Sequence, residues 1–429
     1  MKVLSLFDGM ACGMLAMQSA GIKVDRYVAF EIDKYAVQTS SHNFPMIEHR
    51  GDVFQADFTE FRGFDFLVGG SPCTYWSIAQ KNNRETEASG MGWELFSQYV
   101  RALREAQPMY FIYENNKSMS NAIRESITEA FGFEPICINS ALVSAQNRQR
   151  LYWVGKRNPD GTYSKVYVDQ PEDRCILLRD VLDGICEQPI CADGDKGKTV
   201  TASYFKYAAS DSFKKANPRM GIAEPVGATN DGKSIALKAQ YHKNNISNFV
   251  VHQTAYGFQS TGVAEPIRVG TYPNDAKNQA AHDSQQYRIY STDGNGVTLC
   301  GNGGGMGAKT GLYAIPIEFD GDIPIKAVSC ADGKTYTVFR VKDGQITIKD
   351  KPYPIKLADG FYIIRKLTVS ECKRLQTVPD WYEFPVSDSQ AYKMLGNGWT
   401  VEVIAHLIKA TQSGNIAEEQ LDLFRILGV

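Results

Sequence analysis

Short apolar runs alternate with helix-like stretches throughout residues 1–157 of this 429-residue chain. The runs read KVLSLF, RYVAFEI, FDFLVGG, MYFIYE and RLYWVG, and residues 10–20 and 93–106 between them have the pattern of helices. This alternation predicts an α/β fold with a parallel, doubly wound sheet covered by helices. In such a sheet the carboxyl ends of the strands meet at one edge, where ligands bind.

The composition changes after residue 157. The chain becomes rich in Gly, Asn, Asp and Ser, with short β-like runs, and Asp343-Gly344 has the residue types of a hairpin turn. Helix-like patterns return in TVSECKRLQTV and VEVIAHLIKATQ, which we expect to pack back on the first part of the chain. We therefore predict a first domain of residues 1–157, completed by 385–429, and a second, loop-rich β domain of residues 158–384.

The composition is that of a soluble protein, with 43% hydrophobic and 22% charged residues. No apolar run is long enough to span a membrane, and the N-terminal MKVLSLFDGM does not have the pattern of a signal peptide. The sequence therefore predicts an intracellular, cytoplasmic protein. Its nine cysteines form no CxxC pairs and have no histidines at zinc spacing, so we expect neither a disulfide framework nor a metal site.

The formal net charge is −2, so a surface for nucleic acid would have to be local. Residues 196–288 hold 12 Lys and Arg against 6 Asp and Glu, a local net charge of +6. Loosely repeated phrases at 197–206, 232–243 and 295–305 have two interpretations. They are either hairpins with turn glycines or polar loops that probe a large ligand, such as the phosphates and base edges of a nucleic acid.

Three successive strand ends carry groups that suit a nucleotide-like ligand. The run VLSLFDGMACG leads from a strand into Gly9 and Gly13, where backbone can approach a ligand, although the pattern is not GxGxxG. Glu31 ends the second run and could accept hydrogen bonds from ribose hydroxyls, or lie at the solvated start of a helix. Asp52 could receive an adenine amino group or simply cap a turn. Together they predict a cofactor at this edge.

A cysteine follows the fourth apolar run, in GGSPC, and a sharp turn there would lift Cys73 to the ligand-binding edge of the sheet. The alternative is a buried structural thiol. A nucleophilic cysteine needs a partner that handles protons, and Glu114 ends the next strand in FIYENN. Arg148 and Arg150, two residues apart in QNRQR, lie on one face if extended and could fix the carboxylate and a substrate.

The ordered motifs FDGMACG, GGSPC, YENN, QNRQR, RKLTVSECKRLQTVPDWY and QAYKMLGNGWTVEVIAHL resemble those of DNA cytosine-5 methyltransferases. The resemblance covers residues 1–157 and 365–410, with a Gly-rich middle like that of phage and bacterial members and catalytic motifs closest to the de novo branch. It implies a Rossmann-like methyltransferase sheet with a target-recognition domain in residues 158–384. The methyl donor would be S-adenosyl-L-methionine and the partner double-stranded DNA.

The family mechanism assigns roles to the residues at the strand ends. Cys73 matches the nucleophile that adds to C6 of a cytosine flipped out of the duplex. Glu114 matches the group that stabilises N3, Arg150 the contact to O2 that also orients Glu114, and Arg148 a support of the same network. The loop after Cys73, TYWSIAQKNNRETEASGMG, matches a closing lid, although a static surface loop explains it nearly as well.

The resemblance also implies the cofactor contacts, with Phe7, Asp52 and Val53 at the adenine, Glu31 at the ribose and the final motif at the methionine end. The full set is Phe7, Asp8, Gly9, Met10, Cys12, Gly13, Glu31, Ile32, Asp52, Val53, Pro72, Asn397 and Trp399. Two motifs depart from the usual pattern. YENN has two asparagines where Asn-Val is commoner, and GNGW replaces Gly-Asn-Ala/Ser-Val.

Other functions compete with this interpretation. An RNA cytosine-5 methyltransferase of the same fold would share the motifs, but the long, partly basic middle favours duplex DNA. An inactive DNA-binding member would not need every catalytic position, and an oxidoreductase would not need Cys73, Glu114 and Arg150 at successive strand ends. The resemblance further implies a monomer with an associated restriction system as one of its contexts.

Overall fold

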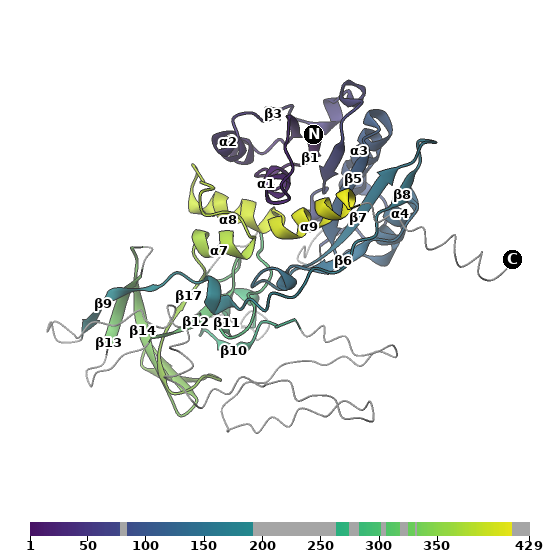
Figure 1. Cartoon of the computed structure of the whole chain (residues 1–429). Helices are drawn as coiled ribbons and strands as arrows, with labels where there is room; N and C mark the ends of the chain where they lie inside the picture. Colours follow the sequence, from purple (N-terminus) through teal and green to yellow (C-terminus); the bar gives the residue numbers. More distant parts are fainter. Residues whose placement is uncertain are drawn as a thin grey trace, which may run out of the picture.

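The computed structural model describes residues 1–77, 84–191, 263–273, 283–301, 306–317, 325–330 and 333–413. Two sheets lie one above the other in Figure 1, and the helices α7 (Val369–Leu375) and α8 (Asp388–Asn397) lie between them. Much of the basic stretch 196–288, with the phrases at 197–206 and 232–243, lies outside the described residues.

The first sheet has eight strands in the order β3-β2-β1-β4-β5-β7-β6, with β8 paired to β7. From β3 to β5 all neighbours are parallel, so the carboxyl ends of these strands form one edge. The strands are β1 (Lys2–Leu6), β2 (Arg26–Phe30), β3 (Glu48–His49), β4 (Phe66–Gly69), β5 (Tyr110–Asn116), β6 (Ile136–Asn139), β7 (Gln149–Arg157) and β8 (Tyr163–Lys165).

One strand of this sheet runs against the expected direction. RLYWVG lies in β7, which is antiparallel to both β5 and β6, so the prediction of a parallel strand there was wrong. A short link, residues 140–148, joins β6 to β7, and a parallel pair would need a longer crossover. The reversal matters for the site, because it brings the start of β7 to the edge where β5 ends, with Arg150 opposite Asn116.

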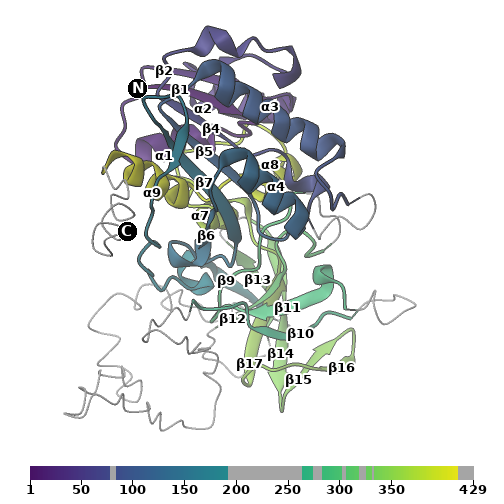
Figure 2. The ribbon, with the colours of Figure 1, turned by 90° about the vertical axis from the view of Figure 1, so that its right-hand side faces the viewer.

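Helices cover both faces of the first sheet, as the sequence predicted (Figures 1 and 2). Val3 of β1 packs with α1 (Cys12–Ser19) and α9 (Val401–Gln412), whereas Leu4 packs on the other face with α3 (Gly90–Ala106) and α4 (Asn121–Phe131). Successive side chains of a strand point to opposite faces, so both must be apolar. A further helix, α2 (Lys34–Asn43), joins β2 to β3.

The second sheet has nine strands, ordered β10-β11-β12-β17-β14-β13-β9, with β15 paired to β14 and β16 to β15. Asp343 and Gly344 both have positive φ and form the two-residue turn between β14 and β15, which confirms the predicted hairpin. The strands are β9 (Ile185–Cys191), β10 (Arg268–Thr271), β11 (Arg288–Ser291), β12 (Leu312–Ile317), β13 (Ile325–Cys330), β14 (Thr335–Lys342), β15 (Gln345–Ile348), β16 (Lys351–Pro354) and β17 (Gly360–Arg365).

A buried ion pair joins the second sheet to the final helices. Arg365 at the end of β17 donates two hydrogen bonds, of 2.6 and 2.7 Å, to the Glu371 carboxylate in α7. Glu371 also accepts hydrogen bonds from the backbone amides of Thr368 and Asp183.

The two sheets confirm the expected fold class, a methyltransferase-type α/β sheet with a second β part. No helix in the described parts of the chain is long and apolar enough to cross a bilayer.

Candidate active site

The turn after β4 is built from residues that have no room for larger side chains. A Cβ on Gly69 would lie 2.7 Å from the carbonyl oxygen of Leu6, and one on Gly70 would lie 2.6 Å from that of Glu114. Ser71 is held to β5, because its carbonyl accepts a 3.2 Å hydrogen bond from Asn115. The chain is thus forced close to Glu114 just before Cys73 starts a short 3₁₀ turn (Cys73–Tyr75).

Glu114 lies near the end of β5, and an ion pair and a hydrogen bond hold its two carboxylate oxygens. Oε1 lies 3.0 Å from Nε of Arg150, and Oε2 accepts a 3.0 Å bond from the indole Nε1 of Trp399. The Glu114 side chain is 12% exposed and that of Arg150 13%, so the pair is screened from bulk water yet remains reachable. The carboxylate is therefore fixed in orientation with part of its surface open.

Cys73 lies within electrostatic reach of this pair. Burial raises the pKa of the Cys73 thiol, the positive charges of Arg150 and Arg148 lower it, and the charge of Glu114 raises it again, for a net increase. The structure thus brings together three predicted residues, Cys73, Glu114 and Arg150, from the ends of β4 and β5 and the start of β7. A raised pKa keeps the thiol protonated until a reaction partner or a base accepts its proton.

Arg148, which we expect to support the network around Glu114, makes its own hydrogen bonds to the backbone of distant segments. Its buried guanidinium donates to three carbonyl oxygens, those of Leu299, Gly396 and Gly398, at 3.3, 3.1 and 2.9 Å, rather than to Glu114. Burial and the neighbouring charge of Arg150 lower its pKa to about 10. Arg148 therefore ties the link before β7 to two segments more than a hundred residues away in sequence.

The loop after β1 is fixed by its backbone conformation and by the loop after β2. Phe7, Gly9 and Ala11 all have positive φ, at 58°, 59° and 60°. The amide of Gly9 donates a 2.8 Å hydrogen bond to Glu31, whose other oxygen accepts from the amides of Ile32 and Asp33. Half-buried Phe7 and the 76% exposed Ile32 offer apolar surface beside this carboxylate. Such a set fits a purine riboside, because the carboxylate can accept from ribose hydroxyls.

Several predicted cofactor residues lie below this surface. Asp8 is buried, and one of its oxygens accepts from the hydroxyls of Ser5 and Tyr27 at 2.6 and 2.7 Å. Burial raises the pKa of Asp8 to about 6, although both hydrogen bonds lower it. A Cβ on Gly13 would lie 2.5 Å from the Tyr27 hydroxyl, so this glycine permits close packing of α1 on the sheet. Cys12 is buried too, and its burial raises the pKa of its thiol to about 12.

The remaining predicted residues border the same region. Asp52 caps a 3₁₀ turn (Val53–Gln55) by accepting from Phe54, which is the simpler of its two expected roles. Asn397 ends α8 against Gly301, where an added Cβ would overlap the Asn397 side chain. Met10 is buried, Val53 is buried, and Pro72 is exposed.

Sequence reasoning missed the residues that hold these loops in place. Arg101 of α3 donates to the carbonyl oxygens of Val53 and Ala56 at 2.8 and 2.9 Å. The hydroxyl of Tyr382 donates a 2.6 Å bond to the carbonyl of Met10. The acceptors in these contacts are backbone carbonyl oxygens, which every residue has, so no sequence pattern predicts them.

A second missed feature holds the loop that follows Cys73. Glu85 accepts hydrogen bonds from the indole of Trp76 at 3.1 Å and from the amide of Gly92 at 3.1 Å, and its own amide donates to Tyr75. Arg84 donates to the carbonyl of Ser118 at 2.7 Å. Glu85 therefore connects the start of the expected lid, at Tyr75 and Trp76, to its end at Gly92. Residues 78–83 of that lid lie outside the described part of the chain.

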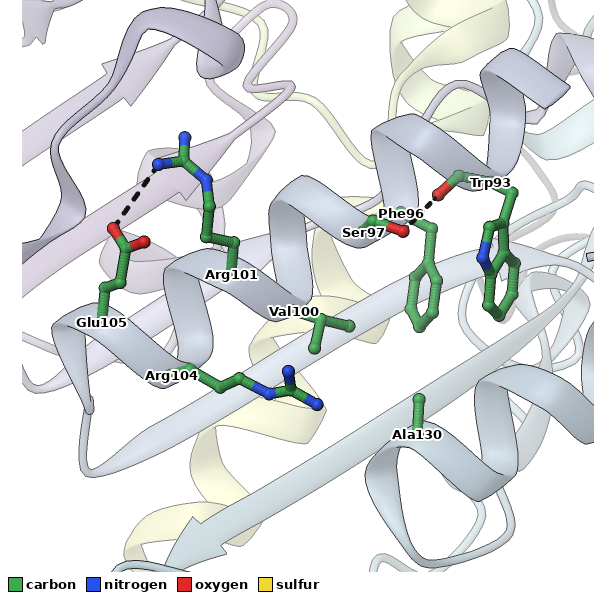
Figure 3. A pocket seen from close by; sticks show the side chains of 8 residues that line it. All are labelled: Trp93, Phe96, Ser97, Val100, Arg101, Arg104, Glu105 and Ala130. Carbon is green, nitrogen blue, oxygen red and sulfur yellow. Dashed lines mark hydrogen bonds and ion pairs between the residues drawn. The ribbon is translucent and has the colours of Figure 1, made fainter. Parts of the chain in front are cut away.

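A separate hollow of about 470 Å³ is lined by side chains of α3 and by Ala130 of α4 (Figure 3). Its lining includes apolar Phe96 and Val100 and the charged side chains of Arg101, Arg104 and Glu105. None of the predicted site residues lines it. Within the described ranges no group of three or more His, Cys, Asp and Glu side chains could hold a metal ion.

A comparison with known protein families decides what this arrangement belongs to. The profile of the family described as C-5 cytosine-specific DNA methylase matches residues 1–413. The chain belongs to this family. The methylase is therefore a DNA methyltransferase, and enzymes of this family use S-adenosylmethionine as methyl donor in general.

Relatives of this methylase occur in phages and bacteria. It is 35% identical over 461 residues to the orphan methyltransferase M.SPRI of Bacillus phage SPR, covering 95% of this chain and 97% of that protein. Over 374 residues it is 27% identical to the orphan methyltransferase M.Rho11sI of Bacillus phage rho11s, covering 80% and 68%. It is 25% identical over 417 residues to the type II methyltransferase M.HpaII of Haemophilus parainfluenzae, covering 94% and 86%.

Solved structures support the fold of the methylase. The S. pombe Dnmt2 methyltransferase matches with a TM-score of 0.50 and 13% identity, covering 97% of this chain and 99% of that one. The Entamoeba histolytica methyltransferase EhMeth matches with a TM-score of 0.50 and 12% identity, covering 96% and 98%. At these identities the likeness concerns the architecture.

Proposed function

We propose that this methylase transfers a methyl group to C5 of a cytosine flipped out of duplex DNA, through a covalent bond between Cys73 and C6. The observation that carries the proposal is the convergence of Cys73, Glu114 and Arg150 at one edge of the first sheet, with Arg150 Nε 3.0 Å from Glu114 Oε1. A thiol, a carboxyl group and a guanidinium in one partly buried place suit nucleophilic addition to a ring that must accept a proton.

Each residue has one task in the proposed reaction. Sγ of Cys73 bonds to C6 as its thiol proton passes to Glu114, the electron pair of the C5–C6 double bond shifts toward N3, and Glu114 hands the proton to N3, which leaves C5 nucleophilic. Arg150 holds Glu114 and contacts the base oxygen O2. When bound, S-adenosylmethionine supplies an electrophilic methyl group for C5. Loss of the C5 proton to a base and elimination of Cys73 then restore the aromatic ring.

We propose that the same edge holds S-adenosylmethionine between the loops after β1, β2 and β3. Glu31 would accept from the ribose hydroxyls, and Phe7 and Ile32 would flank the adenine, with Val53 below it. Half-buried Phe7 and exposed Ile32, which lie beside the hydrogen-bonded carboxylate of Glu31, support this assignment. Asp8, Cys12 and Gly13 would shape the floor of the site rather than touch the donor.

We also propose a division of labour along the chain. Residues 1–157, completed by 385–429, would form the catalytic part, and residues 158–384 would recognise the target site in double-stranded DNA. The excess of basic residues in 196–288 supports this, because phosphate contacts need Lys and Arg. Arg148 is suited to couple the two parts, since it binds Leu299 on one side and Gly396 and Gly398 on the other.

The test has two arms. Plasmid DNA from cells without native methyltransferases, expressing the intact enzyme or Cys73→Ser, is sequenced at base resolution for methylcytosine. We expect methylation at one short motif with the intact enzyme and a fall on the order of a thousandfold or more with Cys73→Ser. Methyl transfer to tRNA but not to duplex DNA would overturn the proposed substrate.

The second arm tests the covalent step. A duplex that carries 5-fluorocytosine at the target should trap the enzyme, because fluorine cannot leave as a cation and Cys73 then cannot be eliminated. We expect an adduct that survives denaturing electrophoresis, mapped to the peptide that contains Cys73. A normal rate for Cys73→Ser without any adduct would rule out this mechanism.

A further inference from the structure

The indole of Trp399 makes a contact that its expected role does not explain. Trp399 was assigned to the methionine end of the cofactor site, yet its Nε1 donates a 3.0 Å hydrogen bond to Oε2 of Glu114. The two residues are 285 positions apart in sequence, and the contact is partly buried. Where the usual motif has valine at this position, no such donor would exist.

This bond changes what Glu114 can do. Arg150 engages Oε1 and Trp399 engages Oε2, so the plane of the carboxyl group is set from both sides. A carboxylate has about four acceptor positions, and the ion pair with Arg150 and the indole bond leave others open, where Glu114 can take up the thiol proton and present it to N3. Hydrogen bonds to a charged acceptor are stronger than neutral ones, so the indole also contributes to the strength with which Glu114 is held.

The backbone that carries Trp399 is itself fixed. The carbonyl of Gly398 accepts from Arg148 at 2.9 Å and from Gln376 at 3.3 Å. On the other side, the Thr400 hydroxyl donates a 2.8 Å bond to Gln376. An aromatic side chain with two rotatable bonds on such a fixed base loses little entropy when it binds.

We propose that Trp399 is a positioning residue for Glu114, which holds the carboxyl group in the orientation that meets N3 of the target cytosine. The proposal deepens the proposed function and rests on the role given there to Glu114. Arg148 acts one step further back, because it fixes the carbonyls of residues 396 and 398 and so the base of the indole. Through Arg148 the GNGW motif is connected to Leu299 in the proposed recognition part, and through Trp399 it is connected to Glu114.

The direct test replaces the indole N–H and keeps an aromatic ring. For Trp399→Phe we expect the single-turnover rate of methyl transfer to fall by on the order of ten- to a hundredfold, as for a lost bond to a charged group. KM for S-adenosylmethionine and for DNA should stay within about threefold of the wild-type values. The analogue β-(3-benzothienyl)alanine at position 399, with sulfur in place of N–H, should reproduce the loss without removing the second ring.

Two further measurements separate positioning from packing. Trp153 offers a matched control, because its buried indole donates a 3.3 Å bond to Thr128 away from the site, so Trp153→Phe should leave the rate unchanged. In a Glu114→Gln background, Trp399→Phe should slow the reaction by less than about threefold, since coupled residues are not additive. Full additivity, or a loss confined to KM for S-adenosylmethionine, would overturn the proposal and return Trp399 to the wall of the cofactor site.

A readout without substrate distinguishes this proposal from the proposed function. The chain has five tryptophans, and the indole N–H resonance of Trp399 in ¹⁵N-labelled protein can be assigned by its loss in Trp399→Phe. It should move to lower frequency in Glu114→Gln, because a charged acceptor becomes neutral. An unmoved resonance would overturn the contact whether or not the enzyme methylates DNA. A moved resonance in an enzyme that methylates no duplex would sink the proposed function alone.

Discussion

Two Arg–Glu pairs, one at the catalytic edge and one at the joint between the two sheets, show how the same chemistry serves different ends. Arg365 and Glu371 are 3% and 0% exposed, and two hydrogen bonds join them. Burial alone would lower the pKa of Arg365, but the Glu371 carboxylate more than reverses this and raises it. In the pair formed by Arg150 and Glu114, Nε lies 3.0 Å from Oε1, and the two side chains are about one-eighth exposed, at 13% and 12%.

The difference lies in how many hydrogen-bonding positions are left over. Backbone amides of Thr368 and Asp183 complete the shell of Glu371, so nothing else can bind there. Glu114 keeps acceptor positions and some exposure, although Arg150 and Trp399 fix its orientation. A saturated pair stabilises the fold, whereas a fixed but unsaturated one is prepared for a ligand.

Glu114→Gln should show the largest effect. We expect the single-turnover rate to fall by about a hundred- to ten-thousandfold, because an amide cannot donate an acidic proton to N3. The free energy of unfolding should change by less than about 1.5 kcal/mol, since glutamine keeps the shape of the side chain and an oxygen that can accept a hydrogen bond. Rapid-quench methyl transfer and urea unfolding measure the two quantities. An unchanged rate would remove Glu114 from its proposed role and erase the contrast with Glu371.

Glu371→Ala should behave in the opposite way. Removing this carboxylate leaves the Arg365 charge buried without its partner, which costs about 3–5 kcal/mol of unfolding free energy. Methyl transfer per folded molecule should remain close to wild type, because Glu371 lies at the joint and not at the catalytic edge. Urea unfolding followed by fluorescence checks the first part. A loss below about 1 kcal/mol would mean that solvent reaches Arg365 easily.

Asp8 lies between the saturated carboxylate of Glu371 and the partly open one of Glu114. One of its oxygens is hydrogen-bonded and the other, Oδ2, is buried without a partner. Its folded-state pKa of about 6 lies above the ordinary value of 3.8, so the folded protein binds this proton more tightly than the unfolded chain. Asp8 therefore lowers stability as the pH rises from about 4 through 6, by about 3 kcal/mol in all.

Asp8→Asn cannot titrate but keeps an oxygen that can accept from Ser5 and Tyr27. We expect the stability of wild type relative to this variant to decrease between pH 4 and pH 7, with little further change above that. Thermal unfolding of both proteins across this pH range is the measurement. Parallel curves would show that Asp8 reaches water and belongs with the open groups.

The smallest effect concerns Arg101, whose guanidinium saturates the carbonyls of Val53 and Ala56 and lies 4.5 Å over the ring of Phe58. Arg101→Met should loosen the turn after Asp52 and raise the Kd for S-adenosylmethionine by about tenfold, with kcat nearly unchanged. Arg104→Met, at a position that also lines the hollow (Figure 3), is the matched control and should leave the Kd as it is. Isothermal titration calorimetry measures both Kd values. Equal increases in Kd would show that the hollow matters rather than the hydrogen bonds of Arg101 to Val53 and Ala56.

Much of the fold could be predicted because its signals are local. The apolar runs become strands of the first sheet, and the paired positive φ values of Asp343 and Gly344 follow from residue type. Cys73, Glu114 and Arg150 could be named because they lie in motifs just after β4, near the end of β5 and near the start of β7. The direction of β7 could not, because apolar composition does not report whether the preceding link is a crossover or a short turn.

The parts that sequence reasoning missed depend on contacts between distant segments. Nothing near Arg148 indicates that it binds carbonyl oxygens of Leu299, Gly396 and Gly398, since any residue has a carbonyl. The same holds for Arg101. Trp399 was recognised as a departure from the usual motif, but its partner Glu114 became visible only once β5 and the end of α8 were placed together.

The distance along the chain between Cys73 and Trp399 has a consequence for newly made protein. The ribosome must add 326 further residues after Cys73 before Trp399 exists, which takes roughly 16 to 65 seconds at the usual speed of synthesis. During that interval the nascent chain carries its thiol and Glu114 without the indole or the carbonyls that Arg148 binds. A half-made chain therefore lacks the hydrogen bond that sets the orientation of the Glu114 carboxylate, and this bond can form only after synthesis has passed residue 399.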